Sequence, residues 1–189
     1  MSLRLNVAPC SATITNMDID DSISLNEIAA LHPLVEVGLF IPFVHYRLRE
    51  LTDGDKVVLT VSFDNFPFYT RKLEITWDEE TPTFRYPPIQ SSVVTEWAAY
   101  GIAAAVLALY TDFRFSRVSV RGERFDYWVT DGVNLCGLEV SGMLHGSLTA
   151  RTQAKQQQLL ANPFIANGYV CVVHFGEALV QLAWYGGES

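Results

Sequence analysis

Residues 121–142 read RGERFDYWVTDGVNLCGLEVSG, and this stretch decides the fold. Bulky apolar side chains recur at every second position along residues 125–129 and again along residues 136–140. A period of two is typical of β-strands, whose successive side chains point to opposite faces of the sheet. The two runs are separated by Asp131-Gly132-Val133-Asn134, which has the composition of a hairpin turn. The stretch therefore predicts an antiparallel β-hairpin.

Each predicted strand also carries one carboxylate, Asp126 in the first and Glu139 in the second. If Thr130 pairs with Leu135, Asp126 faces Glu139 directly. Cβ atoms in such a pair lie about 4.5–5.5 Å apart, and like charges there destabilise a sheet unless something offsets them. A bound divalent cation would offset them, and so would one proton shared by the two carboxylates. A change of register by one residue would place the two side chains on opposite faces and remove the site.

The composition is that of an ordinary globular protein. Apolar residues make up 49% of the 189 residues and charged residues 18%, which is enough apolar surface for a full core. The formal net charge of −8 disfavours broad capture of nucleic acid, because binding to phosphates needs a dense Lys and Arg surface. Any contact with nucleic acid therefore requires a local basic site or a basic partner.

The cysteines and the apolar runs favour a cytoplasmic protein. Cys10, Cys136 and Cys171 are far apart and odd in number, which favours a reduced, intracellular setting over a disulfide or zinc framework. The N-terminal residues lack the long apolar core of a signal peptide. The longest apolar run, Ala98–Tyr110, is too short to cross a bilayer, so we expect no membrane partner.

Residues 1–88 predict a β-rich N-terminal part with one short helix. The helix is expected at residues 20–31, where polar capping residues precede spaced apolar ones and Pro33 follows. Residues 35–51 contain Pro42 and are expected to be extended near a sheet edge. Two β-rich runs, 56–64 and 68–77, favour a hairpin. Residues 1–20 are compatible with a loose arm or with a first edge strand.

Residues 91–189 predict a second, α/β part. Ser91-Ser92 can cap an alanine-rich helix running to Tyr110, whose apolarity on all sides indicates burial. A strand at 113–120 and the hairpin follow. A polar helix is expected at residues 147–161. The last two predicted strands span 169–175 and 178–184.

The order helix, three strands, helix, strand resembles the αβββαβ core of the restriction-endonuclease-like superfamily, the PD-(D/E)XK nucleases. The resemblance covers about half of the chain. In that family an Asp lies on the second core strand, and a Glu followed two residues later by Lys lies on the third. Asp126 and Glu139 stand at these positions, and Glu96 matches an acid that recurs on the first helix. The resemblance therefore implies an α/β (α+β) fold with a nuclease-like core in the C-terminal half.

The lysine of the family motif is replaced here by Ser141. The family lysine orients or activates the attacking water, so its absence affects catalysis more than metal binding. Members of the family sometimes supply this cation from a neighbouring element, and Lys155 on the following helix is placed to do so. Gln158 resembles a helix glutamine of some nuclease branches, and Arg151 could hold a neighbouring phosphate. The resemblance thus implies catalytic roles for the acids and Lys155, and substrate contacts for Arg151, Gln158 and Ser141.

If this chemistry holds, Asp126 and Glu139 would bind Mg²⁺ or Mn²⁺, since hard cations prefer oxygen ligands. The implied function is a metal-dependent hydrolase that acts on nucleic acid phosphodiesters. Its catalysis is either retained, reduced or lost. Two alternatives stay open. One is an inactive nuclease-fold module that binds another protein or a second copy of itself. The other is an acidic inhibitor or immunity-type protein that covers a basic partner.

Structural roles compete with these functional ones. Asp126 and Glu139 are also compatible with two surface carboxylates on the solvent face of the hairpin, or with acids that pair with Arg121 and Arg124. Clustered acids often belong to ion-pair networks and not to active sites. Glu96 lies near a helix N-terminus, where an acid is favourable without any ligand. The polar stripe on the second helix is equally typical of a solvated helix face.

Overall fold

The computed structural model describes residues 18–66, 69–165 and 167–186, and it has a mixed α/β architecture. The predicted mixed class is confirmed at this level. The elements in chain order are β1 (Asp21–Ser24), α1 (Leu25–Ile28), η1 (Ala29–Leu31), η2 (Val37–Phe40), α2 (Ile41–Arg49), β2 (Lys56–Asp64), β3 (Thr70–Thr76), α3 (Ser91–Tyr110), β4 (Arg114–Val118), β5 (Tyr127–Thr130), β6 (Leu135–Met143), α4 (Leu148–Leu160), β7 (Gly168–His174), η3 (Phe175–Glu177) and β8 (Leu179–Tyr185), where η marks a short 3₁₀-helix.

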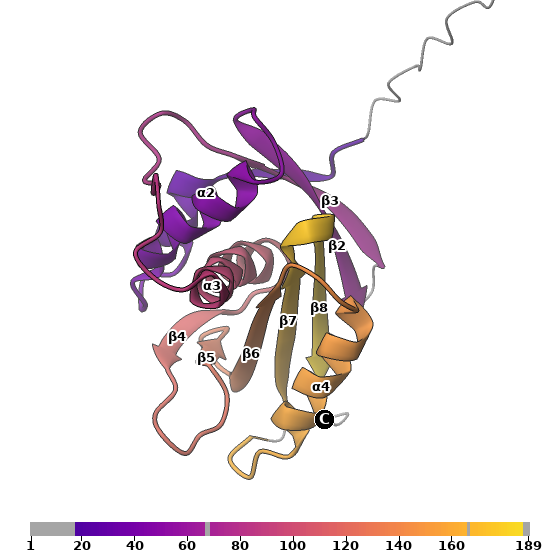
Figure 1. Cartoon of the computed structure of the whole chain (residues 1–189). Helices are drawn as coiled ribbons and strands as arrows, with labels where there is room; N and C mark the ends of the chain where they lie inside the picture. The colour runs from indigo at the N-terminus through magenta and orange to yellow at the C-terminus, as the bar shows by residue number, and fades with distance from the viewer. Residues whose placement is uncertain (1–17, 67–68, 166, 187–189) are drawn as a thin grey trace, which may run out of the picture.

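The strands form an eight-stranded sheet in the order β1-β3-β2-β8-β7-β6-β5-β4 (Figure 1). β4, β5 and β6 form an antiparallel meander, and β6 pairs in parallel with β7 across the α4 crossover. β2 pairs in parallel with β8, so strands from both predicted parts of the chain belong to one sheet. The predicted boundary at residues 78–88 falls in the irregular segment between β3 and α3. The division into 1–88 and 91–189 stays a prediction.

The prediction of an extended segment at residues 35–51 is wrong. This segment forms η2 and α2, so the N-terminal part holds more than the one short helix expected. Pro42 lies in the first turn of α2, where its missing N–H removes no hydrogen bond of the helix. The helix expected at 20–31 is also shorter, because residues 21–24 form β1 and the Ser24 side chain caps α1. The expectation for residues 1–20 concerns mainly residues 1–17, which lie outside the described residues.

Helices cover both faces of the sheet (Figure 1). Alternate residues of β7 enter two separate cores. Val173 packs in the large core that contains α3, and Val172 packs in a smaller core with Leu159 of α4. The neighbouring strand β6 is consequently buried on both faces, and Glu139 is 1% exposed. The interpretation of Glu139 as a surface carboxylate is therefore wrong.

α3 is the central helix, buried as predicted, and it packs between α2 and the sheet (Figure 1). Gly142 on β6 permits a close approach, because a Cβ there would lie 2.8 Å from the carbonyl carbon of Thr95 on α3. Among the described helices, α3 alone is long and apolar enough to cross a membrane by length and composition, and most of it is buried inside the fold. Its apolar surface is thus accounted for by packing.

The central hairpin has the predicted register, with Thr130 opposite Leu135. Asp131 stabilises the turn, since its Oδ1 accepts hydrogen bonds from Val133 N at 2.8 Å and Asn134 N at 2.6 Å. β5 is only four residues long, whereas β6 continues to Met143. β5 pairs with β6 only as far as Leu138, so the next residues of β6 lie beside the loop that precedes β5. Asp126 is the last residue of that loop.

Candidate functional site

Asp126 lies where β5 begins and continues the hydrogen bonding of the strand pair. Its backbone N donates to Leu138 O at 3.1 Å. Its side-chain Oδ2 accepts from the backbone N of Val140 at 2.8 Å, so the carboxylate takes the place of a strand partner. Burial raises the pKa of Asp126, and the hydrogen bond from Val140 and the charge of Lys155 oppose that rise. The alternative in which the acids pair with Arg121 or Arg124 is not formed within the described residues.

Glu139 points from β6 toward α4 and forms an ion pair with Lys155 through Oε1. Its second oxygen, Oε2, is buried and has no hydrogen-bond partner within the described residues. Burial and the charge of Asp126 raise the pKa of Glu139 to about 7, although Lys155 acts in the opposite direction. An unpartnered carboxylate oxygen in the interior is costly, so this atom is the strongest local indication that a ligand belongs here.

α3 contributes Glu96 and Tyr100 to the same cluster. The Tyr100 hydroxyl lies 3.1 Å from Glu96 Oε1 and 3.2 Å from Asp126 Oδ1. A tyrosine has one hydroxyl proton and donates to one carboxylate at a time, so Tyr100 links the two acids. Burial and the charges of both acids raise the pKa of Tyr100, which keeps it protonated at neutral pH. The predicted proximity of Glu96 to the strand acids is therefore present in the structure.

The predicted residues of α4 differ in their placement. Lys155 is 20% exposed and reaches inward to Glu139, and its Nζ also donates to Gln158 Oε1 at 3.4 Å. Arg151 is exposed, and its side chain forms no hydrogen bond or ion pair within the part of the chain that the structure describes. Ser141 is buried, two residues beyond Glu139 on the same face of β6. The structure thus brings Lys155 to Glu139, places the exposed Gln158 beside Lys155, and leaves Arg151 outside these contacts.

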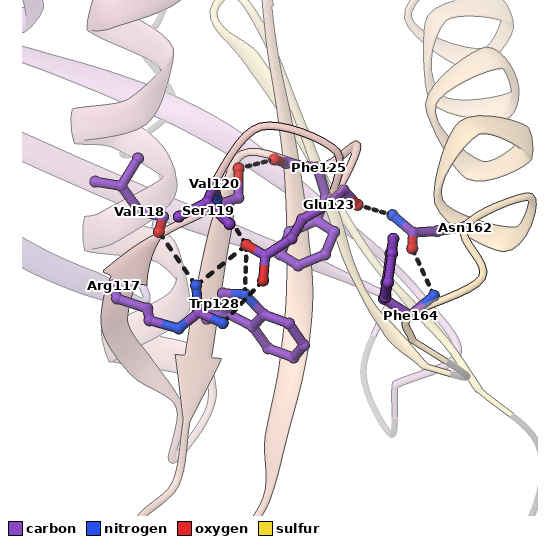
Figure 2. Close-up of polar contacts among 9 residues, drawn as sticks. All are labelled: Arg117, Val118, Ser119, Val120, Glu123, Phe125, Trp128, Asn162 and Phe164. Atoms are coloured by element: carbon purple, nitrogen blue, oxygen red, sulfur yellow. Dashed lines mark hydrogen bonds and ion pairs between the residues drawn. The ribbon is translucent and has the colours of Figure 1, made fainter.

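The loop that carries Asp126, residues 119–126, is held by a dense set of polar contacts (Figure 2). Glu123 accepts two hydrogen bonds from the guanidinium of Arg117, at 3.1 and 3.0 Å, and one from Trp128 Nε1 at 3.0 Å. Asn162, which follows α4, donates to the Glu123 carbonyl oxygen. The loop is therefore tied both to the hairpin strands and to the end of α4, which fixes the position of Asp126.

We expect Glu123→Gln to loosen this loop. The hydrogen bonds from Arg117, together with those from Val120 N and Trp128, lower the pKa of Glu123 to about 2. A lowered pKa contributes stability above the unfolded value of 4.5 that is lost as pH falls toward 2. The variant should therefore have a lower Tm than the wild type at pH 7, and the difference should narrow with acidification. Glu79→Gln, at an exposed position, is the control and should match the wild type.

Sequence reasoning missed Tyr100, the Val140 amide and the Glu123 contacts. Tyr100 was detectable in principle, because it lies four residues after Glu96 and hence on the same face of α3. The contact between the Asp126 side chain and the Val140 backbone has no sequence signal, since it depends on where β5 begins. The Glu123 contacts depend on the loop conformation, in which Arg124 adopts a left-handed φ of 59°.

The residues of the site suit a hard divalent cation in part. Among the described residues no group of three or more His, Cys, Asp or Glu side chains is arranged to hold a metal ion. Within the described residues, Oε2 of Glu139 is nevertheless an available oxygen, and each Asp126 oxygen accepts one hydrogen bond. Mg²⁺ keeps several waters and is commonly held by one or two carboxylates, so Asp126 and Glu139 are the residues that would supply its protein ligands. Comparison of the chain with protein-family models, curated proteins and solved structures gave no match.

Proposed function

We propose that this protein is a divalent-metal-dependent phosphodiesterase that acts on nucleic acid and has a restriction-endonuclease-like core. The observed order α3-β4-β5-β6-α4-β7 supports the fold, because it is the αβββαβ order of that superfamily. The observation that carries the proposed activity is the unpartnered Oε2 of Glu139 in a buried site that also holds Asp126 and Lys155. A divalent cation held by the two buried carboxylates, together with the Lys155 amine, would supply the positive charge that stabilises a phosphate in the transition state.

Each residue of the site has a distinct role in this proposal. Asp126 and Glu139 would hold Mg²⁺ or Mn²⁺, which when bound polarises a phosphate oxygen and lowers the pKa of a water. The hydrogen bonds from Tyr100 and Val140 N orient the Asp126 carboxylate. Lys155 reaches Glu139 from α4 and so supplies the amine that Ser141 does not. There it would position a phosphate oxygen or the attacking water.

A second function is favoured by a different feature of the same site. Lys155 already neutralises Glu139 through a direct ion pair, and a site balanced in this way is stable without a metal ion. The chain would then act as a nuclease-fold module that binds a protein partner. Its net charge of −8 also suits an acidic inhibitor that covers a basic protein. Metal binding distinguishes the two functions.

Mn²⁺ is expected to stabilise the wild-type protein against thermal unfolding. A ligand that binds only the folded state at one hundred times its Kd stabilises by about 2.7 kcal/mol, and Tm rises accordingly. The rise should be larger at pH 8 than at pH 6, because Mn²⁺ competes with the proton that burial favours on Glu139, whose pKa is about 7. The measurement is a Tm series against Mn²⁺ concentration at both pH values.

Glu139→Gln should remove the effect of Mn²⁺, and Glu79→Gln should retain it. Equal Tm values with and without Mn²⁺ in the wild type would rule out the metal site and favour the interaction module.

Cleavage of single- and double-stranded DNA and of RNA with Mn²⁺ then separates an active enzyme from a metal-binding but inactive protein. Lys155→Met should lower the cleavage rate by at least about a hundredfold if Lys155 acts on the transition state.

A further inference from the structure

A second site lies away from the acids, where β2 and β8 end and β6 and β7 begin. A pocket of about 840 Å³ opens there. It is lined by residues from β6, β7 and β8 and from the turns and loops beside the strands: Asn65, Phe113, Asp131, Asn134, Leu135, Cys136, Asn167, Tyr169, Trp184 and Gly186. None of Asp126, Glu139 and Lys155 lines this pocket. Its size falls in the range of pockets that bind small molecules.

Three aromatic side chains form part of the pocket lining. The ring of Tyr169 lies 4.7 Å from the ring of Trp184 and 5.3 Å from the ring of Phe113, measured between centroids. Trp184 and Phe113 are half-buried, so their rings are partly accessible from the pocket. Asn65 has a left-handed φ of 64° and donates from Nδ2 to the carbonyl oxygen of Trp184 at 2.8 Å. This bond ties the turn after β2 to the strand that carries the indole.

The pocket is also electronegative. Asp131 is the one charged side chain among the described lining residues, and no Lys or Arg is present in that set. Hydrogen bonds from the backbone and side chain of Asn134 lower the pKa of Asp131, which stays ionised. Among the described residues its Oδ2 accepts one hydrogen bond, from Asn134 Nδ2, which leaves this oxygen able to accept another.

We propose that this pocket binds an alkylammonium group. A cation over the face of an aromatic ring is attracted by the ring quadrupole, and the attraction grows when the cation is partly removed from water. Asp131 adds a fixed negative charge, and the amide oxygens of Asn65, Asn134 and Asn167 are suitable acceptors for an N–H group. Anions such as phosphates are disfavoured by the same charge. The ammonium group belongs either to a free small amine or to a lysine side chain of another protein.

Choline and its neutral carbon isostere, 3,3-dimethylbutan-1-ol, provide the test, because they share shape and differ in charge. Binding to the full chain is measured by isothermal titration and by NMR of the indole resonances. We expect saturable binding of choline. The affinity for the isostere should be lower by a factor of about ten or more. Equal affinities would show an ordinary apolar pocket and overturn the proposal. Nα-acetyl-lysine amide is titrated in parallel, and tighter binding of that probe than of choline identifies a lysine side chain as the source.

Two variants separate the contributions of charge and ring. Asp131→Asn keeps the acceptor that stabilises the turn and removes the charge, and Trp184→Leu removes the indole. Each should weaken the binding of choline by about three- to thirtyfold. Asp53→Asn, at an exposed acid outside the pocket, should leave it unchanged. If Asp131→Asn folds with the wild-type Tm and binds choline as tightly as the wild type, the proposed cation site is wrong. Glu139→Gln should bind choline normally, because this site is independent of the metal site.

Discussion

Lys155→Met is expected to destabilise the protein by about 3–5 kcal/mol at pH 8.5, because it leaves a buried carboxylate without its partner. Glu139 is 1% exposed, and the Lys155 amine is its one polar partner among the described residues. Asp126 lies close enough to raise the pKa of Glu139. Its negative charge therefore adds to the free-energy cost of an ionised Glu139 that has lost its lysine. Urea denaturation of the variant and the wild type measures the difference.

The loss should depend on pH in a definite direction. Burial raises the pKa of Glu139 from 4.5 to about 7, so the folded protein holds a proton there that the unfolded chain releases. A raised acid pKa makes stability fall as pH rises through that window. Removing Lys155 raises the pKa of Glu139 further, which extends the window upward. The cost of the variant should therefore be smaller at pH 5.5 than at pH 8.5.

Two controls show whether burial of the charge is the cause. Lys56→Met removes an ion pair with Glu74 in which the lysine side chain is 59% exposed, and its effect should be much smaller. The double variant Lys155→Met with Glu139→Gln removes both charges and should recover a large part of the lost stability. A cost for Lys155→Met that is independent of pH and persists in the double variant would contradict a buried, ionisable Glu139.

Gly142→Ala is the second variant with a large expected effect. A Cβ at this position would lie 2.8 Å from the carbonyl carbon and 3.0 Å from Cγ2 of Thr95, so α3 must move away from β6. Overpacking against a backbone typically costs about 1–3 kcal/mol. The shift would also displace Glu96, which follows Thr95, and with it Tyr100. Chemical denaturation is expected to show this loss of stability.

The matched control is Gly54→Ala. A Cβ there would lie 3.4 Å from Thr52 Oγ1, which is an ordinary van der Waals contact and requires no rearrangement. Because Gly54 is exposed, its replacement should change the free energy of unfolding by less than about 0.5 kcal/mol. Equal effects of the two substitutions would mean that the close approach between α3 and β6 does not limit the packing.

The hairpin was predictable because its signals are local. The alternation of apolar side chains and the Asp-Gly-Val-Asn turn predict the strand pair and its register, although β5 begins one residue after Asp126 and only Glu139 lies on a strand. The polar helix expected at residues 147–161 is α4, which spans Leu148–Leu160, and the Ser147 side chain caps it. In these cases the sequence pattern and the tertiary structure favour the same conformation.

The remaining features depend on contacts between distant residues. The parallel pairing of β2 with β8 joins residues 60–64 with residues 179–183, and no local pattern specifies it. Pro42 suggests an extended segment when the sequence is taken alone. Packing of α2 on α3 instead favours a helix, which tolerates proline in its first turn. The burial of Glu139 also required the structure, because only the placement of α4 over β6 encloses it.

The most direct test of the metal site is the position of Mn²⁺ in crystals of the wild-type protein, located by anomalous diffraction. The proposed function predicts a peak roughly 2 Å from carboxylate oxygens of both Asp126 and Glu139. Lys155 should then have moved away from Glu139 Oε1 to face solvent or a bound phosphate. A map without a peak, in which Lys155 remains paired with Glu139 at saturating Mn²⁺, would contradict it.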